Sequence, residues 1–172
     1  MTAATDLLLD AFARVKEEVH RAADGLDADD LEVRLDPDAN SIGWLLWHLT
    51  RVQDDHIAGA SGREEVWVTG DWAELFAFPD DVDGIGYGHT SEQVDLVRGF
   101  DAEHVLAYFD AVHEQTVAYV RGLRDGDLDR VVDGSYVPPV TLAVRLVSVI
   151  SDCLQHAGQV AFVAGVLERR EG

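Results

Sequence analysis

The sequence predicts an all-α protein that forms one four-helix bundle. Four long segments, residues 6–24, 42–59, 101–123 and 141–167, carry apolar side chains at the three- and four-residue spacing of amphipathic helices. No segment alternates apolar and polar residues over a convincing strand length. The link of residues 61–100 is long enough for the second and third helices to run parallel, whereas the shorter links suit antiparallel neighbours.

Length and composition fit a single globular domain over residues 1–172. A chain of this length buries about two-thirds of its unfolded surface, and 47% apolar residues is ordinary for such a domain. The N-terminus lacks a basic region and a cleavage site, and Arg145 and Asp152 interrupt the most apolar stretch. We therefore expect no signal peptide and no membrane span. Cys153 is the single cysteine, which excludes an internal disulfide, suits a cytoplasmic protein and favours a core position.

The formal net charge of −20, from 33 acidic and 13 basic residues, limits the classes of partner. Such a surface repels phosphate backbones and anionic lipids, so we expect neither nucleic acid nor a membrane surface as a partner. All basic residues except Lys16 are arginine. Together with abundant Ala, Val, Gly and Asp, this composition suggests a GC-rich bacterial genome.

Polar residues with capping side chains indicate where the helices begin. Thr5 can cap the first helix, and Asp101 can cap the third. Asn40 or Ser41 caps the second helix. Between the first two helices, residues 27–40 form a connector with room for one helical turn.

Residues 61–100 form an unusual connection. Glycine and proline break this segment repeatedly, yet it contains the bulky apolar residues Trp67, Trp72, Leu75, Phe76, Phe78 and Tyr87. A long connection this rich in aromatic side chains is not a disordered linker, so we expect it to fold back over the bundle as a lid. The sequence from Thr90 to Gln93 has the capping-box pattern and predicts a short helix to about Arg98.

The fourth helix is apolar except for one polar stripe. Its members recur at spacings of three and four residues: Arg145, Ser148, Asp152, His156 and Gln159. At about 100° per residue they fall within one arc of the helix. The stripe is either the solvent face of an outer helix or a polar wall that lines an internal site. Asp152 and His156 are one turn apart, a spacing at which two side chains can bind one metal ion.

A second candidate ligand, His48, lies between Trp44 and Trp47 on the second helix. A histidine between bulky aromatic side chains is usually partly buried and then needs a partner for each ring nitrogen. A backbone carbonyl could be one partner, and Asp55, seven residues on, could be another. If the second and fourth helices face each other, His48 can meet the carboxylate–imidazole pair of the stripe, which gives a ligand set of catalytic metal sites.

The segments WLLWHL and SDCLQHAGQ resemble the DinB-like superfamily. Its members are bacterial four-helix bundles with up-down-down-up topology, often homodimeric. Their divalent metal is held by one histidine of the second helix and a pair one turn apart on the last helix, followed closely by Gly-Gln. His48, His156 and Gly158-Gln159 match this pattern, and Asp152 takes the remaining ligand position. Over essentially the whole chain, the resemblance implies a divalent metal, zinc or nickel, and a homodimer.

Two finer resemblances narrow the expected branch. The GYGHT segment of residues 86–90 and the PPVTL run from Pro138 resemble an uncharacterised actinobacterial branch. Most members have histidine where this chain has Asp152. A carboxylate there resembles the mycothiol-dependent maleylpyruvate isomerases, which have glutamate, although aspartate reaches one methylene less far. The resemblance therefore implies mycothiol, a small thiol of high-GC actinobacteria, as a cosubstrate.

The metal site implied in this way predicts a reaction class. A metal ion with these ligands is a Lewis acid that lowers the pKa of a bound water or thiol. With a thiol cosubstrate, the expected activity is a transferase or isomerase in which a thiolate attacks a small electrophile under the lid. Arg145 and Gln159 could orient the thiol or an acidic substrate. Further acid–base candidates are Tyr87, His89 and His113; the competing interpretations are loop packing for the tyrosine and solvent exposure for the two histidines.

Two other functions remain open from the sequence. A metal-activated water would make the protein a hydrolase, although no Gly-x-Ser-x-Gly, phosphate-binding loop or cysteine-nucleophile pattern supports a hydrolase of another kind. Alternatively, the protein is not an enzyme. It would then be a dimeric bundle that binds a small molecule, or a stress-induced protein whose metal site has decayed.

Overall fold

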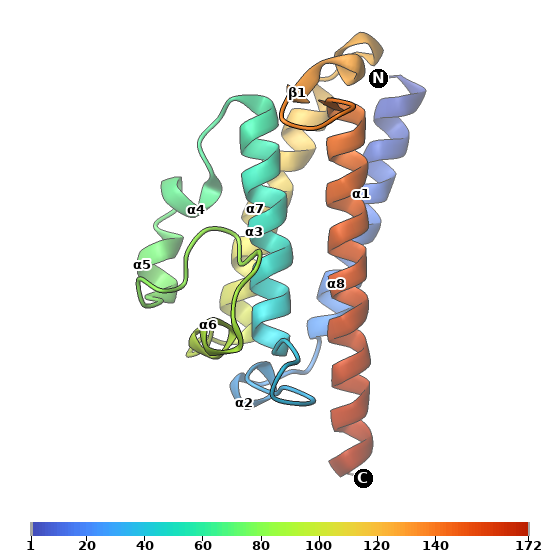
Figure 1. Ribbon diagram of the computed structural model, residues 1–172. Helices are drawn as coiled ribbons and strands as arrows, with labels where there is room; N and C mark the ends of the chain where they lie inside the picture. The colour runs from blue at the N-terminus through green and yellow to red at the C-terminus, as the bar shows by residue number, and fades with distance from the viewer. Residues whose placement is uncertain (1, 172) are drawn as a thin grey trace.

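Four long helices dominate the computed structural model, which describes residues 2–171 (Figure 1). They are α1 (Ala3–Ala23), α3 (Ile42–Ser61), α7 (Ala102–Arg121) and α8 (Leu142–Glu171). In Figure 1, α1 and α8 run downward, whereas α3 and α7 run upward. The parallel pair α3 and α7 is joined by the long connection. The all-α four-helix prediction, with its up-down-down-up topology, is therefore confirmed.

Each long helix packs against two others. Helix α8 contacts α3 and α1, and α7 contacts the same two helices from the other side. The core between them contains fully buried side chains from all four helices, among them Phe12, Leu49, Phe109 and Leu146. Burial of such a side chain contributes roughly 1.5–3 kcal/mol. This arrangement makes α3 and α8 neighbours, which the sequence alone could not establish.

The capping predictions are correct for α3 and α7 but wrong for α1. Ser41 caps α3 and Asp101 caps α7, each through a side-chain oxygen that accepts a backbone N–H. Helix α1 begins earlier than predicted, because Thr2 is its cap and accepts the N–H of Thr5. Thr5 is instead a buried residue of the first turn, and its hydroxyl donates to the carbonyl of Leu123.

Two of the connections contain small elements. The first connector has the expected single turn, α2 (Ala28–Leu31). The second follows α7 and contains η1 (Asp125–Asp129) and two antiparallel strands, β1 (Val131–Asp133) and β2 (Val140–Thr141). The sequence did not reveal this hairpin, because strands of such length are too short to show an alternating pattern.

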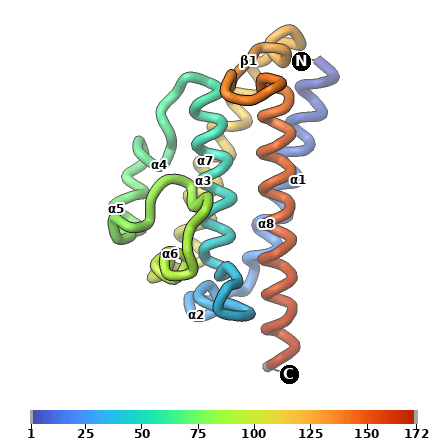
Figure 2. The backbone as a smooth tube through the Cα atoms, in the orientation of Figure 1, coloured from blue at the N-terminus to red at the C-terminus, as the bar shows by residue number. Residues whose placement is uncertain are grey.

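The crossover, defined here as residues 61–100, folds back along α3 and α7 as expected (Figure 2). It contains α4 (Val66–Thr69), α5 (Trp72–Phe76) and α6 (Ser91–Leu96). Its aromatic rings pack against one another and against Tyr108 of α7. The predicted capping box at the start of α6 is present. The crossover is therefore an ordered layer on the bundle.

Helix α8 buries one face and exposes the other. By length and composition, Leu142–Arg170 could span a membrane, but core helices of water-soluble bundles pass the same test. Here Leu142, Leu146 and Cys153 are completely buried in the bundle. Burial raises the pKa of the Cys153 thiol far above its usual range, which agrees with the expected core role and excludes a ready nucleophile.

Candidate metal centre

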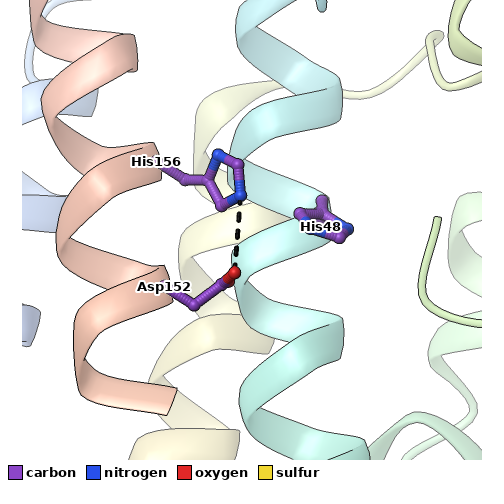
Figure 3. Close-up of side chains that lie close together, drawn as sticks. All are labelled: His48, Asp152 and His156. Carbon is purple, nitrogen blue, oxygen red and sulfur yellow. Dashed lines mark ion pairs between the residues drawn. The ribbon is translucent and has the colours of Figure 1, made fainter. Parts of the chain in front are cut away.

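The predicted ligands His48, Asp152 and His156 lie together in the structure. His48 projects from α3 toward the pair on α8 (Figure 3). One ligand atom from each residue can be chosen so that all three atoms lie within 4.8 Å of one another. The convergence predicted from the sequence is thus present in the fold.

The ring of His48 is fixed on both its face and its edge. Trp44 stacks on the ring with the two centroids 4.4 Å apart. The carbonyl of Ile85, in the crossover, can only accept a hydrogen bond, so Nδ1 of His48 carries the proton and donates it. The second nitrogen, Nε2, then keeps its lone pair. Burial lowers the pKa of His48, which favours the neutral form that binds metal.

The expected support of His48 by Asp55 is wrong. The Asp55 carboxylate accepts from Nδ1 of the adjacent His56 at 2.7 Å, and this bond lowers the pKa of Asp55. Asp55 lies two helical turns beyond His48, which places its short side chain too far along the axis to reach the ring. The backbone carbonyl, which was the other possible partner, takes this place.

His156 has the same arrangement as His48. Its Nδ1–H donates a hydrogen bond to the side-chain oxygen of Gln159, 2.8 Å away. Nε2 is again the open nitrogen, and it lies 3.7 Å from Oδ1 of Asp152. Histidine ligands of metal ions typically donate their second N–H to an oxygen acceptor in this way. Gln159 is therefore a support of the imidazole rather than a free group that could orient a substrate.

Asp152 contains the clearest sign of a missing partner. Its Oδ2 atom is buried and makes no hydrogen bond within the described chain. A buried polar atom without a partner costs about 1–3 kcal/mol, and a charged one costs more. A divalent cation would satisfy this oxygen. Two neutral imidazoles and one carboxylate suit zinc or nickel and leave coordination positions for an added ligand, so the residues present fit a metal ion.

A cavity of about 550 Å³ lies beside this centre, between α3, α8, the β-hairpin and the crossover. It shares Ile85 with the centre, because the carbonyl of this residue bonds to His48. Its polar lining comprises Asp55, His56, Tyr87, Asp133, Tyr136 and Arg145. Arg145 and Asp152 are two turns apart on α8, or about 10 Å along the axis. The cavity and the centre are therefore neighbours along α8.

Two of the further candidates line this cavity. Arg145 is already paired, because its Nη2 donates to Asp133 at 3.1 Å. Its charge is therefore largely neutralised before any ligand binds. The Tyr87 side chain is 90% exposed at the rim, so the interpretation of Tyr87 as a loop-packing residue is wrong.

His89 has a structural role that the sequence did not predict. Its side chain is only 3% exposed, so the expectation of solvent exposure is wrong. Nδ1 accepts from the indole N–H of Trp44 at 3.2 Å, and Nε2 donates to the carbonyl of Asp83 at 3.1 Å. The ring also stacks on Trp47. Because both nitrogens are engaged, His89 holds the crossover against α3 and has no free atom for proton transfer.

His113 lies apart from the metal centre. It is on α7, stacked on Phe109, on the side that faces Lys16 and His20 of α1. Its ring is half-buried rather than exposed, Nδ1 has no partner among the described residues, and burial lowers its pKa. The structure therefore gives no support for His113 as an acid or base at the α3–α8 site.

Sequence reasoning missed the glycine that lets the crossover approach His48. Gly86 is buried with φ +85°, a conformation that favours glycine. A Cβ atom there would lie 2.8 Å from the Trp47 ring and 3.2 Å from Nδ1 of His48. The alternating glycines at 84, 86 and 88 were the available signal, but they were interpreted only as breaks in the chain.

Comparison with known proteins agrees with this fold. Residues 11–160 match the family described as the DinB superfamily. A solved structure described as "Crystal structure of the conserved protein of locus from Enterococcus faecalis" aligns with a TM-score of 0.86 and 27% identity, covering 95% of this chain and 96% of that chain. No curated protein matches. The chain therefore belongs to the DinB superfamily, whereas the actinobacterial branch and the relation to maleylpyruvate isomerases stay predictions.

Proposed function

We propose that this member of the DinB superfamily binds a divalent ion, zinc or nickel, between α3 and α8 and acts as a thiol-dependent transferase or isomerase on a small electrophile. The observation that carries the proposal is the prepared ligand set. His48 and His156 each have Nδ1–H engaged by an oxygen acceptor, and Oδ2 of Asp152 is buried with no hydrogen-bond partner among the described residues. Such a set is stabilised by a cation.

The protein residues would set the charge of the centre. The two neutral imidazoles add no charge, and Asp152 adds one negative charge, so one positive charge of a divalent ion remains to attract an anion. The bound ion supplies Lewis acidity, which lowers the pKa of a thiol toward neutrality. The thiol then releases its proton to solvent, and its sulfur lone pair forms a bond to an electrophilic carbon. In a transfer, the leaving group departs with the bonding electrons; in an isomerisation, the thiolate adds, the adduct rotates, and the thiolate is expelled.

The cavity beside the centre would hold the rest of the substrate. Its two carboxylates, Asp55 and Asp133, outnumber its one guanidinium, and the Arg145 guanidinium is already bonded to Asp133. The lining therefore favours a neutral, hydroxyl-bearing ligand over an anionic one. This changes the role expected for Arg145, which would shape the cavity rather than bind an acidic group. Mycothiol, or a thiol like it, is the cosubstrate that we propose.

We further propose that the protein is a cytoplasmic homodimer. Helix α8 exposes apolar side chains on its outer face, namely Val144, Val147, Leu154 and Phe162. None of the exposed positions of α8 from 144 to 162 is charged, although the chain has a net charge of −20. An uncharged apolar strip can meet its own copy across a two-fold axis without like-charge repulsion.

Elemental mass spectrometry of untagged protein tests the metal site first. We expect about one zinc or nickel ion per chain in the wild type and none in His156→Ala. His104→Ala is the matched control, because His104 is an exposed histidine at the start of α7. No metal in the wild type, and no thermal stabilisation by added metal, would contradict the proposal and favour a decayed site.

Turnover then tests the reaction class. The metal-loaded protein is assayed with mycothiol and a chromogenic chloronitrobenzene, and separately with an ester and no thiol. We expect thiol-dependent turnover that is lost in His48→Ala and His156→Ala. Thiol-dependent turnover that survives loss of all three ligands would refute the mechanism, and metal-dependent ester cleavage without thiol would favour the hydrolase instead.

A further inference from the structure

A buried arginine is connected to the metal ligand His48 through the crossover. Arg51 lies one turn after His48 on α3, and its side chain is 7% exposed. Its Nε and Nη2 atoms both donate to the carbonyl of Gly84 at 3.2 Å. The next carbonyl along the chain, that of Ile85, accepts the Nδ1–H of His48. The guanidinium and the candidate ligand His48 therefore bond to the carbonyls of two adjacent peptide units.

Other contacts fix the position of this guanidinium. Nη1 donates to the Glu65 carboxylate at 2.6 Å and to the Tyr108 hydroxyl at 3.3 Å. The guanidinium carbon also lies 4.9 Å from the centre of the Trp67 ring, within the range of a cation–π interaction. A planar guanidinium held in this way can present two parallel N–H groups to a single carbonyl, which a lysine cannot do.

Asp54 holds the other end of the same network. Its Oδ1 accepts from the N–H of Val66 at 2.8 Å, and its Oδ2 accepts from the N–H of Trp67 and the hydroxyl of Tyr108 at 2.7 Å. Asp54 and Arg51 are one turn apart on α3. Asp54 thus holds the beginning of the crossover against this helix, and Arg51 holds the Gly84 carbonyl against it. A buried ion pair gives little net stability compared with apolar packing, so its geometry is the more informative property.

The segment that these contacts hold fits tightly against His48. Gly86 packs so closely on Trp47 and on Nδ1 of His48 that a Cβ atom would force the chain away. A small displacement of residues 84–86 would therefore break the bond between His48 and Ile85. Nothing else in the described chain accepts the Nδ1 proton. The orientation of this ligand consequently depends on the crossover.

We propose that Arg51 is a positioning residue for the metal centre. By holding the Gly84 carbonyl, it places the Ile85 carbonyl against Nδ1 of His48 and so keeps the tautomer whose Nε2 faces Asp152 and His156. Arg51 itself touches neither the ion nor the substrate. This inference rests on the proposed metal site, but its first test needs no metal.

The first test is the tautomer of His48 in metal-free protein, measured by ¹⁵N NMR of histidine-labelled samples. The His48 signals are assigned by their loss in His48→Gln. Wild type should show the pure Nδ1–H form, and Arg51→Met should show a mixture of both tautomers. Arg34→Met is the matched control. Arg34 is also largely buried, with 11% exposure, but it donates to the carbonyls of Ala39 and Ser91 and not to residues 84–86. An unchanged tautomer in folded Arg51→Met would overturn the inference.

The second test is metal affinity, measured by competition with a chromophoric chelator. Loss of a group that bonds directly to a metal-binding histidine typically costs about 10- to 100-fold in metal affinity. Arg51 acts one contact further from the ion, so we expect the lower end of this range, about 10-fold, for Arg51→Met and a change below about twofold for Arg34→Met. Equal losses in the two variants would show a general loosening and overturn the inference. If the wild type binds no metal, the proposed function fails, while the tautomer still tests the role of Arg51.

Two further variants keep the inference testable if Arg51→Met does not fold. Arg51→Lys keeps the charge but cannot donate twice to Gly84 while reaching Glu65, so it should also mix the tautomers. Gly86→Ala displaces the same segment without removing a charge. In a double-mutant cycle, the losses of metal affinity in Arg51→Lys and Gly86→Ala should be clearly non-additive, because both changes break the same contact, between His48 and the Ile85 carbonyl. Additive losses would contradict a shared route through Ile85.

Discussion

Asp152→Asn should stabilise the metal-free protein and at the same time remove its stabilisation by metal. In the wild type, Oδ2 of Asp152 is buried and has no hydrogen-bond partner in the part of the chain that the structure describes, so a negative charge there is poorly compensated until a cation binds. Asparagine keeps the shape of the side chain but removes the charge. A residue retained for metal binding should therefore lower stability in the empty site, which is a common cost of functional residues.

The expected sizes follow from the burial and the chain length. A buried polar atom without a partner costs about 1–3 kcal/mol when neutral and more when charged, and asparagine removes only the charge. We take about 1 kcal/mol for this difference, because the Asp152 side chain is 34% exposed. For a chain of 172 residues, each kcal/mol shifts the Tm by about 2–4 °C, so metal-free Asp152→Asn should melt about 2–4 °C higher. Metal at 100 times its Kd stabilises the wild type by about 2.7 kcal/mol, or about 5–11 °C.

Thermal melts of chelator-treated protein, with and without added zinc or nickel, measure both effects. Asp110→Asn is the control. Asp110 also lies beside a histidine, but its carboxylate is already paired with Lys16 and His20. This control should melt lower without metal and keep the full metal-induced shift. If Asp152→Asn instead lowers the metal-free Tm and leaves the metal-induced shift intact, Asp152 is a structural residue and the reasoning fails.

Three further predictions concern other parts of the chain. Gln159→Leu removes the acceptor of the His156 Nδ1–H, so chelator competition should show about a 10-fold loss of metal affinity; unchanged affinity would contradict this support role. Burial lowers the pKa of His113 below its unfolded value, so the unfolded chain binds a proton there more readily than the folded protein. The contribution of His113 to the free energy of unfolding is therefore fully present above about pH 6.5 and is lost as the pH falls. Urea melts of metal-free His113→Leu should therefore lose less stability on acidification than the wild type, and an equal loss would refute this. Phe162→Glu puts a charge on the exposed strip of α8, and light scattering should show a monomer in place of a dimer; a dimer that persists would exclude this face as the interface.

The fold was predictable because its signals are local. The apolar periodicity of each long helix depends on residues within a few turns, and Asp101 caps α7 as its sequence indicates. The errors arose where tertiary packing decided between similar signals. Thr2 and Thr5 can both cap a helix, and the choice depends on Thr5 being buried against Leu123, far away in sequence.

The convergence of the candidate-site residues was predictable for the same reason, but the groups that support them were not. Asp152 and His156 show their pairing on one helix, and the tryptophans beside His48 indicate its burial. The acceptor for His48 is a backbone carbonyl, which any residue at position 85 would provide, so it has no signature in the sequence. His89 was misjudged because its partner Trp44 lies on another element, and only the folded crossover brings the two together.

The polar stripe of α8 also explains how the centre can be both prepared and accessible. Asp152 and His156 turn toward α3, whereas Ser148 and Gln159 are exposed, so the stripe follows the boundary between the bundle and solvent. Both interpretations of the stripe were therefore partly correct. At this boundary, the crossover covers the His48 side and supplies the Ile85 carbonyl, while the cavity beside α8 shares Ile85 with the same centre.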